Sequence, residues 1–235
     1  MKDQLARNIL ELRGHVAEAC QEHDRDADDI TIVAVTKTHP AAIIKMAVAA
    51  GLHNIGESRV QEAEPKITEA GPIARYHMIG HLQTNKAKKA VGLFDVIQSV
   101  DSYRLAEEID RQAGRIKRRI ECLIEVNTSG EQQKFGVTPN DCLDLVGRVA
   151  SLDWIELAGL MTIGPFTDDV DRIHSAFALC CDLYRRGRDT VGDRFDTLSM
   201  GMTDDFPLAI AEGSTMIRVG TLLFGERRPW RESPA

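Results

Sequence analysis

The hydrophobic residues of this chain fall into two patterns that alternate from end to end. Short apolar runs rich in β-branched residues predict buried strands, and apolar residues at helical spacing between them predict amphipathic helices. The first helix is expected over residues 2–22, where Leu5, Ile9, Leu12 and Val16 share one face. The expected strands are residues 31–36, 53–56, 76–80, 95–100, 121–127, 156–162, 197–200 and 215–219.

This alternation predicts the fold class. A helical pattern separates each pair of successive strands, and no hairpin signal joins two of them, which favours parallel pairing. We therefore expect an α/β fold, a single (β/α)8 TIM barrel with an extra N-terminal helix, and an open doubly wound sheet is the alternative. No linker, low-complexity tract or repeat divides the chain, so residues 1–235 are expected to form one domain.

Composition and charge indicate which partners and which cellular compartment to expect. A formal charge of −7 argues against a general nucleic-acid or anionic-membrane binder, because such proteins need an excess of basic surface. The N-terminus is charged and lacks the apolar core of a signal peptide, and no apolar run reaches membrane-spanning length. The five cysteines show no metal-ligand spacing, and their odd number suits a reducing compartment. We expect a cytoplasmic protein.

The first strand ends by presenting a lysine, Lys37, just before the His39-Pro40 break. Two interpretations are open from the residues alone. The side chain can simply reach past the strand end into water. Alternatively, a pocket can hold the amine with its pKa lowered by desolvation, ready to form a Schiff base.

Two glycine-containing loops follow the last two expected strands. Ser199, Met200 and Gly201 end the seventh strand, and Gly220 and Thr221 follow the eighth. In (β/α)8 barrels these loops commonly bind phosphate, because glycine lets backbone N–H groups approach the oxygens and hydroxyls add hydrogen bonds. A single loop of this kind is more often ordinary turn material, and the presence of two at these strand ends makes phosphate binding an equal alternative.

Arg218 lies near the end of the eighth strand, where an inward-facing arginine needs an anion, a ring nitrogen or several acceptors. Together with Lys37 and a phosphate site, it provides the parts needed to bind pyridoxal 5′-phosphate. An arginine beside the pyridine nitrogen can only donate a hydrogen bond, so the ring stays neutral and carbanion chemistry is less favoured.

Five motifs in order carry a resemblance to a known family. They are residues 34–38, 55–62, 77–86, 199–205 and 217–225, and together they extend over nearly the whole chain. The chain resembles the pyridoxal phosphate homeostasis protein family, which is similar to the N-terminal barrel of bacterial alanine racemase. The resemblance implies pyridoxal 5′-phosphate bound through a lysine aldimine, a role in intracellular cofactor balance and no established enzymatic turnover.

The resemblance also implies roles for individual residues. Lys37 would be the aldimine lysine, Arg218 would lie at the pyridine nitrogen, and Ser199, Gly220 and Thr221 would bind the phosphate. Met200 and Gly201 belong to the same phosphate-side loop, and Met78 and His81 would line the pocket. Lys134 matches a loop lysine that the family uses for secondary cofactor binding or transfer, and an ordinary solvated lysine is the alternative. Ser58 stands where the family often has asparagine.

Two functions from different classes follow from these residues. One is a non-catalytic carrier or regulator of pyridoxal phosphate, with apo-enzymes as possible recipients. The alternative is a pyridoxal-phosphate-dependent amino-acid racemase or related enzyme, which needs a second base that a further domain supplies in alanine racemase. The chain ends soon after the eighth strand, so we expect the carrier, acting as a monomer. His77 and His81 are four residues apart, but the expected strand and turn between them remove the helical face that a metal pair needs, and no metal is expected.

Overall fold

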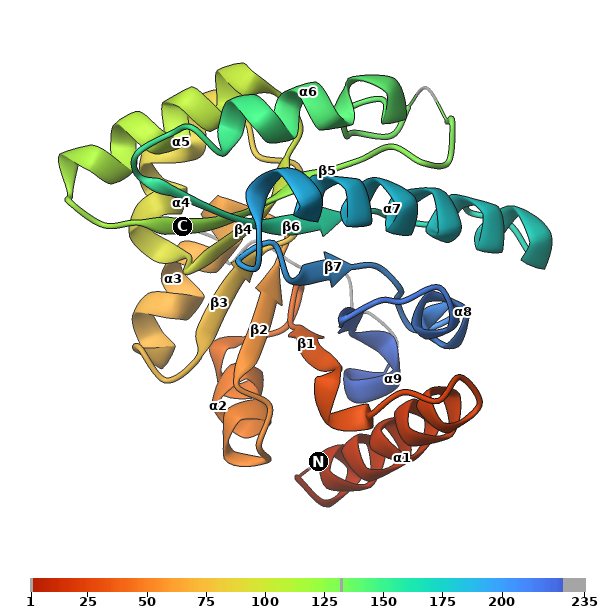
Figure 1. Ribbon diagram of the computed structural model, residues 1–235. Helices are drawn as coiled ribbons and strands as arrows, with labels where there is room; N and C mark the ends of the chain where they lie inside the picture. The colour runs from red at the N-terminus through yellow and green to blue at the C-terminus, as the bar shows by residue number, and fades with distance from the viewer. Residues whose placement is uncertain (1, 132, 226–235) are drawn as a thin grey trace.

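The computed structural model describes residues 2–131 and 133–225, and its centre is a closed barrel of eight strands (Figure 1). All neighbouring strands are parallel and follow one another in chain order. The strands are β1 (Thr31–Val35), β2 (Asn54–Glu57), β3 (Arg75–Met78), β4 (Val96–Val100), β5 (Ile120–Glu125), β6 (Ile155–Met161), β7 (Thr197–Ser199) and β8 (Met216–Val219). The (β/α)8 barrel prediction is confirmed.

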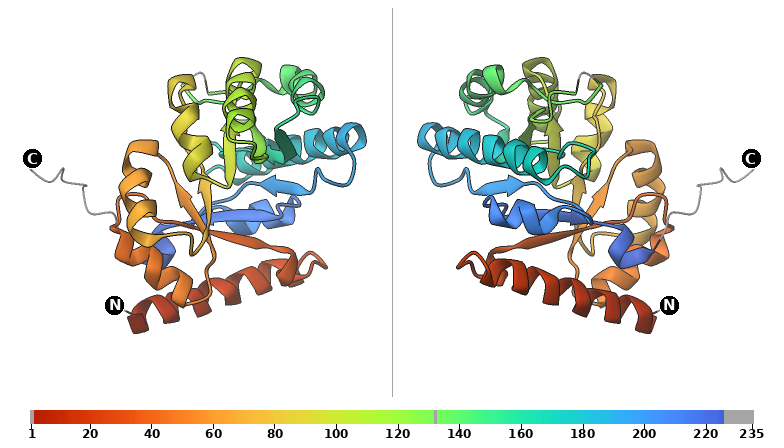
Figure 2. Two further views of the ribbon diagram at one scale, coloured as in Figure 1. Left: turned by 90° about the vertical axis from the view of Figure 1, so that its left-hand side faces the viewer. Right: turned by 90° about the vertical axis from the view of Figure 1, so that its right-hand side faces the viewer.

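Helices surround this barrel, as the two side views show (Figure 2). They are α1 (Lys2–Gln21), α2 (Ala41–Ala49), α3 (Val60–Ala70), α4 (Ala87–Leu93), α5 (Tyr103–Arg115), α6 (Pro139–Val149), α7 (Val170–Val191), α8 (Phe206–Ala211) and α9 (Thr221–Phe224), with 3-10 turns η1 (Ala27–Asp29) and η2 (Thr84–Lys86). Within the described residues, no helix combines the length and the apolar character that crossing a membrane requires.

Side-chain caps begin several of these helices where the sequence places a short polar residue. Ser102, Thr138 and Asp169 each accept a hydrogen bond from the backbone N–H three residues later. Such caps satisfy donors that the first helical turn otherwise leaves unpaired. They fix where α5, α6 and α7 begin, and therefore how long the loops above the barrel are.

Between the third and fourth strands the sequence pattern predicts a helix over residues 81–90, and this segment differs most from the structure. Residues 81–83 form an extended loop, η2 follows, and α4 starts only at Ala87. Tertiary contacts hold this loop: Leu82 is buried in the core, and His81 Nδ1 lies 3.2 Å from Asp101 Oδ2. Helix α9, which the sequence pattern did not indicate, is only four residues long. Both differences lie at the carboxyl ends of strands.

The additional helix α1 packs against α8 and α9 (Figures 1 and 2). Leu5, Leu12 and Val16 on its inner face are buried, as the helical spacing predicts. Asn8 Nδ2 also donates to the carbonyl of Leu223 at 2.9 Å. The first and last described elements are therefore held together.

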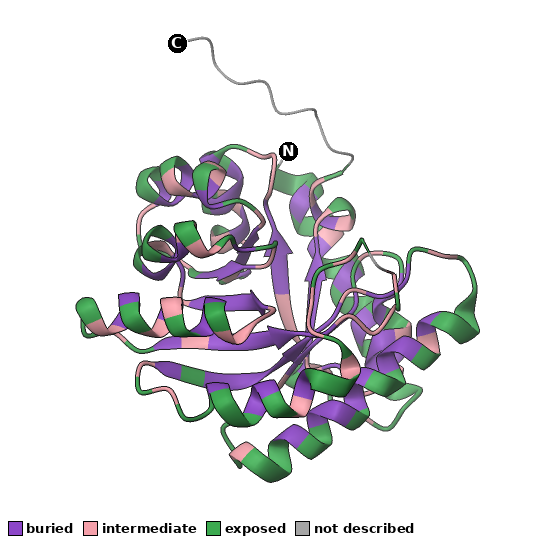
Figure 3. Cartoon of the chain, turned by 90° about the horizontal axis from the view of Figure 1, so that it is seen from above, coloured by how far each residue is buried: buried purple, intermediate pink, exposed green. Residues whose placement is uncertain are grey.

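Two layers of core lie on the two sides of the barrel wall. The larger lies between the strands and the surrounding helices, and most of the buried hydrophobic residues belong to it. A smaller cluster of Leu123, Ala158 and Met161 forms the second. Seen from above, the buried strands occupy the centre and the exposed helix faces point outward (Figure 3). All five cysteines are buried and none forms a disulfide.

Candidate functional site

Lys37 lies two residues beyond the last residue of β1, in a turn that is neither fully buried nor fully exposed. The next residue, Thr38, has a φ of +68°, a left-handed conformation that is uncommon for a β-branched residue. Its backbone N–H donates to Glu62 Oε1 at 2.5 Å, which helps to hold this conformation. The turn that carries Lys37 is therefore fixed from α3.

A buried ion pair holds the other side of the same turn. Lys66 Nζ lies 2.5 Å from Glu57 Oε1 and donates to the carbonyl of Thr36 at 2.7 Å. The Thr36 hydroxyl donates to the same carboxylate oxygen at 2.6 Å. Burial raises the pKa of Glu57, and the Lys66 ammonium and the hydrogen bonds from Lys66 and Thr36 act in the opposite direction.

We call Glu57, Glu62 and Lys66 the lysine clamp, because they hold the residues on both sides of Lys37. The sequence interpretation missed them. Their available signal was the i, i+4 spacing of Glu62 and Lys66, 3.2 Å apart in the structure, next to an acidic residue at the end of a buried strand. That spacing is equally typical of an exposed helical pair.

Arg218 of β8 is buried inside the barrel, with 4% of its surface exposed. One guanidinium nitrogen donates to the Ser199 hydroxyl at 2.6 Å, and the other donates to the carbonyl of Thr162 at 2.8 Å. Ser199 in turn donates to Gln98 Oε1 at 2.7 Å. Ser199 can donate this proton to a phosphate oxygen only by releasing Gln98, because a hydroxyl carries a single proton.

The polar chain continues across the barrel to His77. Gln98 Nε2 donates to His77 Nδ1 at 2.9 Å, so the ring proton is on Nε2 and points at Asn54 Oδ1, 3.1 Å away. Burial, with a smaller contribution from Arg75, lowers the pKa of His77 to about 3. His77 is therefore a neutral link in a hydrogen-bonded network. Among the described residues no cluster suitable for a metal ion is present.

Glu125 ends β5 as a second buried carboxyl group. Its Oε2 atom is buried and has no hydrogen-bond partner within the described residues. Burial and the neighbouring Asp101 carboxylate raise the pKa of Glu125 to about 7, and attraction to Arg218 partly opposes this shift. The protonation of this group therefore changes close to neutral pH.

The loop of Gly220 meets the end of β1, and the loop of Gly201 meets β8. Strands β1 and β8 pair with Ala34 opposite Val219, which brings Gly220 alongside Val35. A Cβ atom on Gly220 would lie 3.2 Å from the carbonyl oxygen of Val35, so the glycine permits a close approach. Gly201 has a φ of +94°, and its carbonyl accepts the backbone N–H of Arg218 at 3.0 Å.

The remaining predicted site residues lie in different environments. Met78 and Met200 are buried in the large core between strands and helices. The His81 ring stacks on Phe135 with centroids 3.7 Å apart. The Lys134 ammonium is partly exposed, donates to the carbonyl of Gly164 at 2.7 Å and pairs with Glu131 at 3.0 Å.

The fold brings together side chains and backbone groups that suit the phosphate, the ring and the aldehyde of pyridoxal phosphate. The turn of Lys37 follows β1, Gly220 and the exposed Thr221 follow β8, and the buried guanidinium of Arg218 belongs to β8, which pairs with β1. Such a set can hold a phosphate on backbone N–H groups and offer a donor to a ring nitrogen.

Comparisons with known proteins assign a family to this barrel. The sequence pattern of the family described as "Alanine racemase, N-terminal domain" matches residues 2–228. An alanine racemase of Clostridium difficile 630 in complex with cycloserine has a TM-score of 0.77 at 16% identity, and the match covers 97% of this chain and 60% of that one. At this identity the likeness establishes the fold.

Closer relatives share most of their length with this chain. The pyridoxal phosphate homeostasis protein of Pasteurella multocida (strain Pm70) is 36% identical over 227 residues, which cover 95% of this chain and 97% of that protein. PipY of Synechococcus elongatus PCC7942, solved with PLP bound, is 38% identical with a TM-score of 0.82, and the match covers 94% of this chain and all of that one. This chain belongs to the pyridoxal phosphate homeostasis protein family, within the alanine racemase N-terminal domain fold.

Proposed function

We propose that this protein binds pyridoxal 5′-phosphate as an aldimine of Lys37 and acts as a carrier or regulator of the cofactor. In this proposal Gly220, Thr221 and the loop of Ser199, Met200 and Gly201 hold the phosphate, and Arg218 donates to the pyridine nitrogen. Met78 and His81 contribute to the surroundings of the ring. The bound PLP of PipY and the names of the relatives support this choice of ligand.

The observation that carries the proposal is the pairing of β1 with β8. It brings the turn of Lys37 beside Gly220, while Arg218 of the same strand is buried within the barrel. The lysine clamp holds the turn through hydrogen bonds to the backbone of Thr36 and Thr38. A preorganised amine next to a phosphate loop favours binding, because little conformational freedom is lost when the ligand enters.

The choice of a carrier over an enzyme rests on Arg218. A guanidinium keeps its proton, so the pyridine nitrogen that accepts from it stays neutral and the ring withdraws electrons weakly. Arg218 already has two acceptors, Ser199 and Thr162, which keep it oriented without the ligand. We propose apo-enzymes that need pyridoxal phosphate as recipients and a monomeric single-domain carrier.

The aldimine is tested by spectroscopy and mass spectrometry. Wild-type protein and Lys37→Ala are incubated with pyridoxal 5′-phosphate, and the absorbance of the internal aldimine is recorded before and after borohydride reduction. We expect the aldimine band and a reduced phosphopyridoxyl adduct on the peptide of residue 37 in the wild type, and neither in Lys37→Ala. Lys88→Ala, at an exposed position of α4, is the matched control. An unchanged spectrum in Lys37→Ala would refute the assignment.

The carrier role is tested with the loaded protein. Transfer of the cofactor is followed as the recovery of activity by an apo-enzyme, and turnover is followed as racemisation and α-proton exchange of D- and L-amino acids. We expect transfer and no sustained racemisation. Rapid, Lys37-dependent racemisation would establish the enzyme instead.

A further inference from the structure

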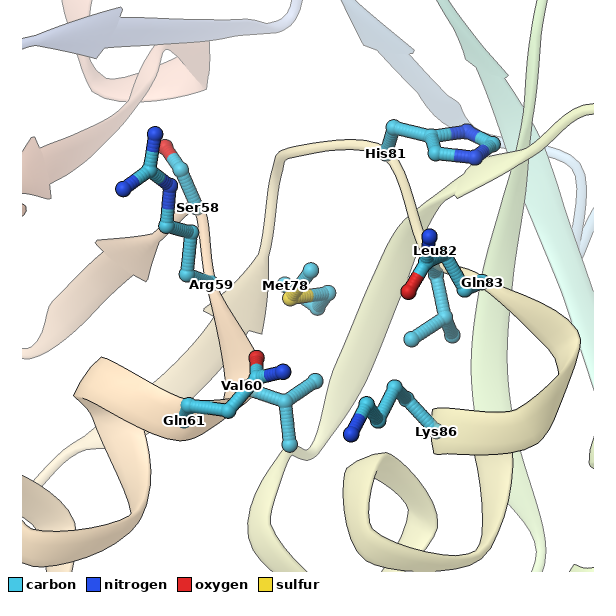
Figure 4. A pocket seen from close by; sticks show the side chains of 9 residues that line it. All are labelled: Ser58, Arg59, Val60, Gln61, Met78, His81, Leu82, Gln83 and Lys86. Atoms are coloured by element: carbon cyan, nitrogen blue, oxygen red, sulfur yellow. The ribbon is translucent and has the colours of Figure 1, made fainter.

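A pocket opens between the start of α3 and the loop that leads into α4 (Figure 4). Its volume is about 220 Å³, enough for a small polyatomic ion and its immediate surroundings. The residues that line it are Ser58, Arg59, Val60, Gln61, Met78, His81, Leu82, Gln83 and Lys86. Only Met78 and His81 among them belong to the residues predicted to contact the cofactor.

The charge of this lining is entirely positive. Arg59 and Lys86 supply two cations, and none of the nine residues carries a carboxylate. Neither cation takes part in an ion pair or a side-chain hydrogen bond within the described residues. Among the nearby acidic side chains, Asp101 lies 3.2 Å from the His81 ring, Glu62 pairs with Lys66, and Glu64 pairs with Lys89. Two cations without a counter-ion are notable in a chain of net charge −7.

The Lys86 amine and two side-chain amides lie around a common space, and the Arg59 guanidinium lies at its rim (Figure 4). Figure 4 shows the Lys86 amine extending from η2 into the pocket toward Val60, with the amides of Gln61 and Gln83 on either side. The Arg59 guanidinium extends along the rim beside the Ser58 hydroxyl. Val60, Met78 and Leu82 are buried and give the pocket an apolar floor, which strengthens charge–charge attraction above it.

The backbone adds donors to the same wall. Helix α3 has eleven residues, and its N-cap residue Arg59 makes no side-chain capping bond. The first-turn N–H groups of such a helix favour an anion. Ammonium, guanidinium, amide and hydroxyl donors together match a group with several acceptor oxygens and about two negative charges.

We propose that this pocket, formed by Lys86, Arg59, Gln61, Gln83 and Ser58, binds the phosphate group of a small molecule or free inorganic phosphate. None of the residues that line this pocket belongs to the phosphate loops that follow β7 and β8, and the proposal does not depend on the proposed function of those loops. A monocarboxylate is a weaker match, because it brings one charge and two oxygens to a site with two cations and several donors.

Amide chemical shifts test the proposal. Protein labelled with 15N is first saturated with pyridoxal 5′-phosphate and then titrated at low ionic strength with inorganic phosphate, with acetate in a parallel series. We expect phosphate to shift the amides of Val60, Gln61 and Gln83 saturably and acetate to shift them less. Lys86→Met should weaken phosphate binding about tenfold. Lys88→Met, at an exposed position of α4 outside the pocket, should leave it unchanged.

The same titration separates failure of this proposal from failure of the cofactor proposal. Amides of Gly220 and Thr221 respond to pyridoxal 5′-phosphate if those loops bind it, whatever happens at α3. No saturable shift at α3 with either inorganic phosphate or glycerol 3-phosphate, an equal loss in Lys86→Met and Lys88→Met, or equal binding of acetate would overturn the phosphate pocket. A dependence on phosphate monoesters such as glycerol 3-phosphate, without binding of inorganic phosphate, would identify the small-molecule source.

Discussion

At the scale of single residues, Glu125 combines deep burial with a carboxylate oxygen that has no hydrogen-bond partner among the described residues. Burial and Asp101 raise its pKa from 4.5 to about 7. In the unfolded chain the group ionises at a lower pH, so the stability that its protonated form contributes is complete below pH 4.5 and is lost as the pH rises through 7. The difference corresponds to about 3 kcal/mol.

We therefore expect Glu125→Gln to flatten part of the pH dependence of stability. Relative to wild type, the free energy of unfolding of the variant should rise by about 3 kcal/mol between pH 4 and pH 8, because the variant has no carboxyl group to ionise. Urea denaturation at several pH values measures this difference. Glu107→Gln, at an exposed position of α5, is the control and should follow wild type. Parallel profiles for Glu125→Gln and wild type would contradict the shifted pKa.

The lysine clamp gives a second residue-scale prediction. Lys66→Met leaves the carboxylate of Glu57 buried without its cation, which should lower the free energy of unfolding by about 3–5 kcal/mol. Adding Glu57→Gln should restore part of this loss, because the uncompensated charge is then removed. Chemical denaturation measures both effects. Lys45→Met, whose ion pair with Glu69 is largely exposed, should change stability by less than about 1 kcal/mol.

At the scale of elements, Gly159 determines how closely β6 approaches β7. A Cβ atom built there would lie 1.7 Å from the carbonyl oxygen of Thr197, and the pairing of β5 with β6 shifts register at the same place. Gly147, in α6, has no atom within 4 Å of an added Cβ. The two glycines therefore have opposite structural roles.

Alanine substitutions should separate these roles. Gly159→Ala should lower the free energy of unfolding by more than about 3 kcal/mol or prevent folding, because backbone must move to accept the methyl group. Gly147→Ala should raise it by about 0.5–1 kcal/mol, because alanine favours a helix. Thermal and urea unfolding measure both variants. A Gly159→Ala protein as stable as wild type would show that the two strands can separate without cost, and a destabilised Gly147→Ala would contradict the open space around α6.

At the scale of the whole molecule, the barrel has no free strand edge, and α1 joins the last elements to the first. Leu12 lies on the inner face of α1 and is fully buried, whereas Leu10 of the same helix is 75% exposed. Parallel strands that close on themselves share their hydrogen bonds around the ring. Loss of packing under α1 should therefore weaken the whole barrel.

Leu12→Ala should lower the free energy of global unfolding by about 2–5 kcal/mol, because the removed side chain leaves a cavity. Leu10→Ala should stay within about 0.5 kcal/mol of wild type. Urea denaturation followed by both tryptophan fluorescence and circular dichroism measures the change and shows whether one transition is kept. If Leu12→Ala only frayed α1 and left the barrel transition unchanged, α1 would not be part of the cooperative unit.

The sequence determined the fold class and the order of its elements. Apolar runs of five or so residues separated by helical patterns predict a parallel sheet, either closed into a barrel or open and doubly wound, and the strand preceding Lys37 could be identified from its β-branched residues. The position of Lys37 and the two glycine loops at strand ends followed from the same pattern. These features depend on neighbours in the chain, and so the chain alone predicts them.

The tertiary structure decided which side chains meet. Buried strands are apolar on both faces, so the sequence did not show that His77 points into the barrel while Met78 next to it packs outward. The ion pair of Lys66 with Glu57 and the hydrogen bond from Arg218 to Ser199 each join two different elements. The unpaired oxygen of Glu125 likewise depends on what the other strands place around it. Contacts of this kind depend on register and burial across the barrel, which local sequence pattern does not specify.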